Sequence, residues 1–522
     1  MSANLEKSGR NVATVVTVGR EVVSFSELAR VALDGAPIQL QSAMLDAHLA
    51  PSRERLREAL ARGTPVYGVS TGFGSACGNR TAAERTNELG RNLIRYHGCG
   101  IGEPFPLAAV RGAMLSRLLC FRLGYSGVST ELCSQLASFL NLGITPVVPT
   151  LGSVGASGDL TPMSYIAAAL AGERDVFFEG RQVPAADALR TAGIEPHRFQ
   201  PKEPLAMING TAMMTGTALL CTVRARRVLG AATLATALGV HAIAGHGHHF
   251  DPFVMAAKPH RGMSQVAAAL QRLLVAESEV QEATEEGALQ DPYSFRCSPH
   301  VLGVLADALT WIQQWVEIEA NGADDNPLLH PRSGEVLTGG NFYGGHIALA
   351  MDSLKTAVAS VGDVCDRQFA LLVDGRFSRG LPDQLVAPGE AEEGLHHGFK
   401  GMQITASALV AEALHATMPL TSFSRSTESH NQDKVSMGTI AARSALRTTE
   451  LVEGAVATHL LGAAQAAELR GRLAARPALA TAVRRLRTLS PAVTVDRPLD
   501  ADIRRVQSAI AAGDLDDVVA AE

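Results

Sequence analysis

The 522-residue sequence contains few aromatic side chains: Phe, Trp and Tyr together make up 5% of it. Strands prefer aromatic and β-branched residues, so this shortage, in a chain rich in Ala, Leu and Gly, argues against a β-rich architecture and favours packed helices. Charged residues account for 19% and hydrophobic residues for 46%. That balance is ordinary for a folded protein and excludes wholesale disorder.

The sequence also lacks a block of basic residues and a long apolar run. Its formal net charge is −6, from 46 Lys and Arg against 52 Asp and Glu, so we expect no nucleic-acid partner. The most apolar stretch, residues 228–245, is rich in Ala, Gly and Thr and contains His241. It falls short of the about 20 strongly apolar residues that span a membrane. We therefore expect a buried core helix there and no membrane partner.

Cysteine is scarce and is not arranged in pairs. The seven cysteines are scattered, with no Cys-x-x-Cys motif, which indicates reduced thiols and argues against a disulfide framework or a zinc site. The first residues include Glu6 and Lys7 and no apolar run of the kind that forms a secretory signal. These features predict a cytoplasmic protein.

Helical periodicity is the dominant pattern in the second half of the sequence. Apolar residues between 301 and 316 recur at intervals that keep one helix face apolar. Other predicted helices cover residues 349–364, 402–414 and 438–461, and a last one begins with Asp500 as its cap.

The N-terminal part mixes short elements with loops. Residues 15–18 predict a strand, and Ser24 with Glu27 forms a capping box ahead of a helix. Gly-rich loops are predicted over residues 67–78, 98–106 and 152–159.

We predict a mainly α fold, a long-helix bundle with a small mixed N-terminal region. The N-terminal domain is assigned to residues 1–205 and contains the Gly-rich loops. The C-terminal helical bundle domain is assigned to residues 206–522.

The segment Gly152–Pro162 is the most informative of these loops. Taken by itself, it predicts a turn that leads into a helix, with Thr161 as N-cap and Pro162 as the first helical residue. A phosphate-binding loop would require a Lys that is absent, and a nucleophile elbow would require Gly-x-Ser-x-Gly, whereas the glycines flank Ser157 at another spacing. From residue types alone, a plain structural turn remains open.

This segment closely resembles the signature of the aromatic amino acid ammonia-lyases and aminomutases. In that family the equivalents of Ala156, Ser157 and Gly158 cyclise autocatalytically, with loss of two waters, to the electrophile 4-methylidene-imidazol-5-one (MIO). Small Ala and Gly residues permit the tight backbone that ring closure requires, and Ser supplies the hydroxyl that leaves. The resemblance implies an MIO cofactor, no metal, and a long-helix bundle of the histidine and phenylalanine ammonia-lyase type. It also implies a homotetramer with active sites shared between subunits.

Further motifs carry the resemblance along most of the chain. Tyr67, in the string Tyr67–Gly74, matches the family's catalytic base, although Ser70 stands where members often carry Asn. A phenol with a pKa of about 10 requires nearby donors or helix ends to act as a base at neutral pH. Asn209, which precedes Gly210 and Thr211, matches the residue that contacts the electrophile and the substrate amine.

The string Gln290–Arg296 matches the family's Gln-Asp-x-Tyr-Ser-x-Arg. By this resemblance, Arg296 clamps the substrate carboxylate through paired hydrogen bonds. Gln290 and Tyr293 support the electrophile and the substrate, and Phe342 lines the substrate pocket.

Two histidine clusters raise the question of a metal site. One contains His241, His246, His248, His249 and Asp251, and the other is the pair His396 and His397. Metal binding requires ligands that converge on a defined frame. Because the family that this sequence resembles needs no metal, we predict no metal site.

The substrate prediction depends on two positions. Tyr96 and His97 occupy the place where phenylalanine enzymes of the family carry Phe-Leu and histidine enzymes carry Ser-His. His97 can hydrogen-bond a phenol or an imidazole, and leaving it unpaired beside a phenyl ring costs about 1–3 kcal/mol. Asn431 and Gln432 belong to an Asn-Gln-Asp string typical of phenylalanine and tyrosine enzymes, with Gln432 where histidine enzymes carry Glu. Together these positions predict L-tyrosine.

The strings Arg95–Gly100 and His396–Gly401 are most similar to bacterial tyrosine 2,3-aminomutases of secondary metabolism. They predict conversion of L-tyrosine to β-tyrosine through an MIO-bound amine and 4-coumarate, with Lys400 in a pocket-lining segment. Tyrosine ammonia-lyase, which releases 4-coumarate and ammonia, is the first alternative, because lid dynamics separate the two outcomes. Histidine ammonia-lyase is the second alternative.

Two other classes of protein are alternatives to this family. The fumarase and aspartase superfamily also eliminates ammonia on a helical fold, but its Gly-Ser-Ser-x-Met-Pro-x-Lys-x-Asn signature is absent from the sequence. A non-catalytic helical scaffold would lack the near-ultraviolet absorbance expected of the electrophile.

Overall fold

The structure is a computed structural model, and it describes residues 14–19, 21–276, 289–386 and 394–517. The chain forms two compact units. The first comprises Met1–Leu220, Gln313–Met351 and Pro419–Arg443, and the second comprises Cys221–Ile312, Asp352–Met418 and Ser444–Glu522. The predicted domain boundary between residues 205 and 206 stays a prediction.

Four long helices contain boundaries between the units: α9 (Ala212–Ala242), α13 (Ser298–Asn321), α14 (Gly345–Val373) and α16 (Gly438–Arg470). Each includes a segment for which the sequence predicted a helix. The sequence therefore located them correctly, although most of their ends lie beyond the predicted ones, whereas α9 ends at Ala242, before the predicted residue 245.

The first unit contains every strand of the described residues. β1 (Val16–Val18) pairs in parallel with β2 (Ile38–Leu40), and β3 (Ile101–Pro104) pairs antiparallel with β5 (Pro149–Leu151). The other strands, all antiparallel, are β4 (Thr145–Pro146) with β6 (Asp175–Phe178) and β7 (Arg181–Pro184), and β8 (Leu328–Leu329) with β9 (Val336–Leu337).

The first unit also contains helices that lie wholly within it. They are α1 (Phe25–Ala29), α2 (Ser42–Ala61), α3 (Thr86–Tyr96), α4 (Leu107–Phe121), α5 (Thr130–Leu142), α6 (Leu160–Leu170), α7 (Ala185–Ala192) and α8 (Glu203–Ile208). The predicted capping box at α1 is confirmed, because Ser24 and Glu27 exchange side-chain and backbone hydrogen bonds. A π-helical turn, Arg30–Asp34, follows α1.

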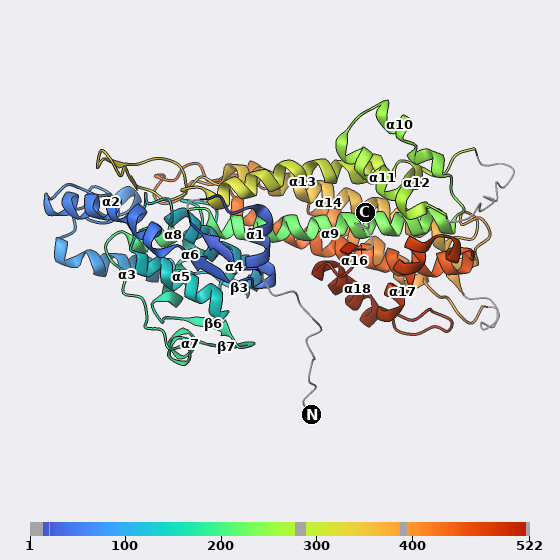
Figure 1. Cartoon of the computed structure of the whole chain (residues 1–522), viewed down its shortest axis with the longest axis horizontal. Coiled ribbons are helices and arrows are strands. Elements are labelled where there is room, and N and C mark those ends of the chain that lie inside the picture. Colours follow the sequence, from blue (N-terminus) through green and yellow to red (C-terminus); the bar gives the residue numbers. More distant parts are fainter. Residues whose placement is uncertain (1–13, 20, 277–288, 387–393, 518–522) are drawn as a thin grey trace. The chain divides into compact units, whose positions relative to one another are not determined.

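The described residues of the second unit form helices and the loops between them, without a strand. Besides the parts of the long helices, it holds α10 (Pro252–Ala256), α11 (Arg261–Leu274), α12 (Tyr293–Arg296), α15 (Lys400–His415), α17 (Pro477–Leu489) and α18 (Asp500–Ala512). Within this unit the long helices run along one another (Figure 1), and Arg224 of α9 donates to Glu453 of α16 at 2.7 Å.

The apolar stretch at residues 228–245 lies mostly in α9, where Val228, Leu234 and Leu238 are completely buried. This confirms the prediction of a core helix. Within the described ranges, no helix has the length and apolar character that crossing a membrane requires.

Three local predictions were wrong. The helix after the Gly-rich loop begins at Leu160 with Asp159 as its N-cap, so Thr161 and Pro162 lie inside the first turn. Leu499 rather than Asp500 caps α18. Residues 98–106 are not entirely a loop, because β3 pairs there with a strand almost fifty residues later in the chain.

Candidate active site

A cavity of about 930 Å³ lies within the first unit. It brings together most of the residues that the resemblance assigned to the active site: Tyr67, Tyr96, His97, Ala156, Ser157, Asn209, Phe342, Asn431 and Gln432. They come from the loop after α2, the end of α3, the loop before α6, the end of α8 and two later loops.

The loop that contains Ala156, Ser157 and Gly158 has an unusual backbone. Ser157 has φ of +48°, in the left-handed region that L-residues other than glycine rarely adopt. Gly158 has φ of +79°, and a Cβ atom at this position would collide with the Gly210 carbonyl. Only glycine therefore fits at position 158. Strain of this kind, which costs about 1–3 kcal/mol, accumulates at functional sites.

Hydrogen bonds to two other segments, one around Gly210 and one at Thr439, hold this loop in place. The N–H of Gly210 donates to the Ser157 carbonyl at 3.0 Å, and the N–H of Asp159 donates to the Gly210 carbonyl at 2.7 Å. The buried Asp159 carboxylate accepts from the N–H of Met214 at 2.8 Å and from the Thr439 hydroxyl. Burial raises the pKa of Asp159 to about 7, against the lowering effect of these two hydrogen bonds.

Two amide side chains face the Ser157 region of the cavity. Gln432 donates from Nε2 to the Ser157 hydroxyl at 3.1 Å, and Thr427 donates to Oε1 of Gln432 at 3.0 Å, which fixes the orientation of the amide. Asn209 donates from Nδ2 to the Asn326 carbonyl at 2.8 Å. Its Oδ1 is buried and has no hydrogen-bond partner among the described residues. A buried acceptor without a partner is costly and calls for a ligand donor.

Tyr67 is partly buried, and its phenol oxygen accepts a hydrogen bond from the N–H of Gly74 at 2.9 Å. Burial raises the pKa of Tyr67, the Gly74 N–H lowers it, and the charges of Glu428 and Cys77 raise it further. The net direction is upward. A phenolate at this position therefore requires positive charge in addition to the one backbone donor.

Glu428 is a cavity residue that the sequence analysis did not identify. Its carboxylate accepts from the N–H and the hydroxyl of Ser75, at 2.8 and 2.9 Å, and so ties this segment to the loop that carries Tyr67. Residues 428–430 all have positive φ. The sequence around Glu428 did not indicate a functional role for it, although Glu428 directly precedes the string that includes Asn431 and Gln432.

His97 lies at the C-cap of α3 with its ring 4.5 Å from that of Tyr96. Burial lowers the pKa of His97 to about 4, so the imidazole is neutral at pH 7. Its side chain has no hydrogen-bond partner among the described residues. The ring is therefore able to donate a hydrogen bond to a ligand or to accept one.

The other predicted site residues, Gln290, Tyr293, Arg296 and Lys400, belong to the second unit and do not line this cavity. The Arg296 guanidinium lies 4.5 Å from the centre of the Tyr293 ring, and its Nε is buried without a partner in the described part of the chain. Tyr293 is 73% exposed. Gln290 and Lys400 are also exposed.

The histidine cluster after α9 is held by an aspartate. His249 lies 3.5 Å from Asp291, whose carboxylate also accepts from the N–H of His246. In the described ranges, no group of three or more His, Cys, Asp or Glu side chains is arranged to hold a metal ion.

Comparisons with known proteins agree with the fold. The family model described as "Aromatic amino acid lyase" matches residues 23–488. A histidine ammonia-lyase of Geobacillus thermodenitrificans is 37% identical over 494 residues, 95% of this chain and 96% of the relative. The histidine ammonia-lyase of Treponema denticola is 36% identical over 94% of this chain and 95% of the relative.

Solved structures extend the comparison to other activities. The tyrosine aminomutase from Streptomyces globisporus superposes with a TM-score of 0.91 at 34% identity, over 98% of this chain and 99% of that one. The phenylalanine aminomutase of Pantoea agglomerans gives a TM-score of 0.88 at 30% identity, over 95% and 98% of the two chains. The mainly helical fold is therefore the one shared by these enzymes, and the chain belongs to the aromatic amino acid lyase family.

Proposed function

We propose that the chain is a tyrosine 2,3-aminomutase, which converts L-tyrosine to β-tyrosine and releases some 4-coumarate through a tyrosine ammonia-lyase side reaction. The observation that supports tyrosine as the substrate is the neutral imidazole of His97, which lines the cavity and has no hydrogen-bond partner among the described residues. A cytoplasmic location remains part of the proposal.

The phenol end of the substrate lies at His97 in this proposal. A neutral imidazole pairs with a phenol hydroxyl as donor or acceptor, whereas a phenyl ring would leave it unpaired. Gln432 supports the same choice, because its amide is already engaged by Ser157 and Thr427 and offers no carboxylate to an imidazole substrate.

The residues at the other end of the cavity fit an MIO group. The tight turn at Ser157 and Gly158, together with the unsatisfied Oδ1 of Asn209, provides a strained loop and a buried acceptor beside it. MIO supplies an electrophile for the substrate amine. Ala156, Ser157 and Gly158 would form it, and Asn209 and Gln432 would hold it.

Tyr67 removes a proton from the substrate carbon at its phenol oxygen in this scheme. Burial and Glu428 raise the pKa of Tyr67, so ionisation requires a cation nearby. The substrate's ammonium provides one when it enters beside Glu428. Leu89, Leu93 and Phe342 line the same cavity and exclude water around the reacting carbons.

Arg296 binds the substrate carboxylate, and we assign it to a site completed by another copy of the chain in a homotetramer. The support is the exposure of Tyr293, which stacks on Arg296, and of apolar side chains on two other helices. Ile318 of α13 is 69% exposed and Ile404 of α15 is 63% exposed. Apolar side chains of this size gain free energy when they are buried against another protein surface. Sedimentation that finds a fully active monomer would contradict the assembly.

Product analysis tests the proposal directly. Purified protein is incubated with L-tyrosine, and the products are separated by chromatography so that β-tyrosine and 4-coumarate are both counted. We expect β-tyrosine together with some coumarate. Coumarate alone would identify a tyrosine ammonia-lyase instead.

Histidine ammonia-lyase is the second candidate, because the curated relatives compared above carry that name. It predicts deamination of L-histidine and no turnover of L-tyrosine. That result would overturn the tyrosine assignment while leaving the family unchanged.

A further inference from the structure

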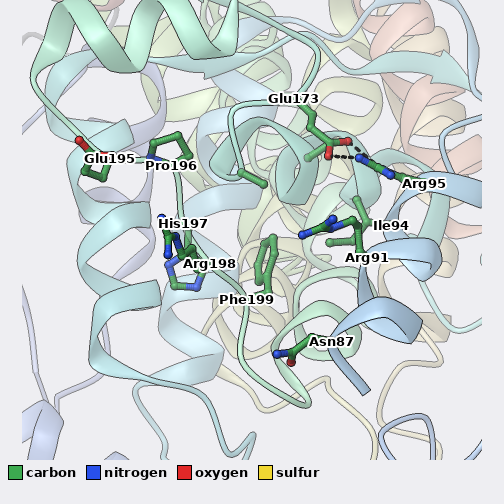
Figure 2. Close-up of a pocket in the computed structure, with 12 residues that line it drawn as sticks. Asn87, Arg91, Ile94, Arg95, Glu173, Glu195, Pro196, His197, Arg198 and Phe199 are labelled. Atoms are coloured by element: carbon green, nitrogen blue, oxygen red, sulfur yellow. Dashed lines mark hydrogen bonds and ion pairs between the residues drawn. The ribbon is translucent and has the colours of Figure 1, made fainter. Parts of the chain in front are cut away.

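A second cavity of about 980 Å³ lies in the first unit, close in volume to the candidate active site. Figure 2 shows the residues that line it. They come from α3, from the end of α6 and the residues after it, and from residues 195–199. None of these residues belongs to the lining of the candidate active site.

The charges in this cavity fall into paired and unpaired groups. Arg95 donates to Glu173 at 2.7 Å, and His197 lies 2.9 Å from Glu203 (Figure 2 shows the first pair as dashed lines). The guanidiniums of Arg91 and Arg198 form no hydrogen bond or ion pair with another residue that the structure describes.

The Glu195 carboxylate is also unpaired among the described residues. In Figure 2 it points away from Arg91, whose side chain extends toward Phe199 in the middle of the cavity. The unpaired charges of Arg91, Arg198 and Glu195 sum to a single positive charge. That balance suits a ligand with one negative charge.

Apart from the Asn87 amide, the remaining lining is apolar. Phe199 is partly buried and its ring packs edge-on against His197, with 4.9 Å between ring centres. Ile94 and Pro196 lie on the same cavity surface. An aromatic ring with one carboxylate matches both features, because the ring covers the apolar surface while guanidinium binds carboxylate through paired hydrogen bonds.

The two cavities share helix α3. Leu89, Leu93 and Tyr96 of this helix line the candidate active site, at spacings of four and three residues. Asn87 and Arg91, again four apart, line the second cavity. Residues three and four apart occupy one side of a helix, so opposite sides of α3 face the two cavities.

A pair of consecutive residues connects the second cavity to the predicted specificity residues. Glu173 holds Arg95, and Arg174 donates to the Gly98 carbonyl at 3.3 Å. Tyr96 and His97 lie between the two anchored positions. The Arg95–Glu173 pair is exposed, and an exposed ion pair is readily exchanged for another partner.

We propose that this cavity is a second ligand site that binds aromatic monocarboxylates between Arg91, Arg198 and Phe199, and that its occupation changes substrate selectivity through the α3 end that carries Tyr96 and His97. A bound carboxylate competes with Glu173 for the guanidiniums on this side of α3. Release of Arg95 from Glu173 frees one of the two anchors beside His97. The effect on selectivity rests on the proposed function, whereas the binding does not.

Equilibrium dialysis with labelled benzoate tests the binding. We expect the double variant Arg91→Gln/Arg198→Gln to lose one bound benzoate per chain, or to bind it at least about tenfold more weakly, because two charge-assisted contacts are removed. Glu195→Gln removes a repulsion and should bind benzoate more tightly. Arg85→Gln is the matched control, since this exposed arginine pairs with Glu88 outside both cavities. Binding unchanged in the double variant, or inorganic phosphate bound in place of benzoate, would overturn the site.

The ratio of kcat/KM for tyrosine to kcat/KM for phenylalanine tests the coupling. Benzoate that competes in the active site lowers both values by the same factor, so it leaves their ratio unchanged. We expect benzoate to change the ratio in the wild type and in Arg85→Gln, and to leave it constant in the double variant. A constant ratio in the wild type would overturn the effect on selectivity. A protein that turns over neither substrate refutes the proposed function, and the dialysis result still decides whether the site exists.

Discussion

Replacement of His97 by Phe is the sharpest test of how the cavity selects its substrate. In the structure the imidazole lines the cavity, and it is neutral at pH 7 because burial lowers its pKa to about 4. Its ring nitrogens have no hydrogen-bond partner among the described residues. His97→Phe keeps a ring of similar shape and removes the polar atoms. Tyrosine then loses its hydrogen-bond partner, whereas phenylalanine meets an apolar wall.

The size of the effect follows from the cost of an unpaired buried polar group. That cost is about 1–3 kcal/mol, and it applies to His97 beside a phenyl ring in the wild type and to the phenol hydroxyl in the variant. Both costs lower the ratio of kcat/KM for tyrosine to that for phenylalanine, so together they amount to about 2–6 kcal/mol and we expect the ratio to fall by a factor of about 30 to 25,000. Because the His97 pKa is about 4, the factor should be constant between about pH 6 and pH 9.

The assay follows all products by chromatography, so that cinnamate, coumarate and both β-amino acids are counted for each substrate. His300→Phe is a suitable control, because that exposed histidine lies outside both cavities. An unchanged ratio in His97→Phe would remove His97 from substrate recognition. A ratio that changes only below pH 5 would mean that the imidazolium, and not the neutral ring, binds the substrate.

Three further outcomes test other parts of the site. Ser157→Ala should abolish turnover and the near-ultraviolet absorbance of the electrophile while helical circular dichroism stays unchanged; near-normal turnover would refute a cofactor made from this loop. Glu428→Gln removes a charge that raises the pKa of Tyr67, so the rise of kcat/KM with pH should move to lower pH, and a shift to higher pH would contradict Tyr67 as the base. Gln432→Glu should increase turnover of histidine relative to tyrosine, as measured with both substrates in competition; an unchanged ratio would exclude Gln432 from the choice between them.

Long helices were predictable from the sequence because their signal is local and repeated. Residues 301–316 keep one face apolar over several turns, and the structure extends this segment to Ser298–Asn321. The strand β3 could not be found in this way. It is four residues long and exists only because Ile101 and Pro104 pair with residues near 150, across an irregular register. Such a pairing leaves no periodic pattern in either segment.

Helix ends were the least predictable features. Thr161 and Asp500 both have side chains that cap helices well, yet each helix begins with a neighbour in the cap position. At α6 the cap residue is Asp159, whose carboxylate accepts hydrogen bonds from Met214 and Thr439 and makes none to its own helix. A distant partner therefore overrides the local preference.

The residues of the candidate site came from resemblance to a family, and their arrangement came from the structure. Tyr67, Ser157, Asn209 and Gln432 are far apart in sequence, and no local pattern indicates that they line one cavity. The sequence also could not reveal that the surroundings of Tyr67 raise its pKa, since Glu428 is about 360 residues away in the chain. Whether the pKa of a side chain is raised or lowered depends on such neighbours, which are distant in the sequence.

Helix α6 connects the two ends of the candidate site through the core. Asp159 at its N-terminus fixes the loop with Ser157, and Glu173 and Arg174, just beyond its C-terminus, hold both sides of Tyr96 and His97. The helix has 11 residues, about 16 Å at 1.5 Å per residue, and Thr161–Leu170 are all buried. A close-packed helix transmits displacement instead of absorbing it. Under the proposed function, this buried helix lies between the Ser157 loop and the anchors on both sides of Tyr96 and His97, so a substrate would have to match the distance between them as well as the chemistry at each end.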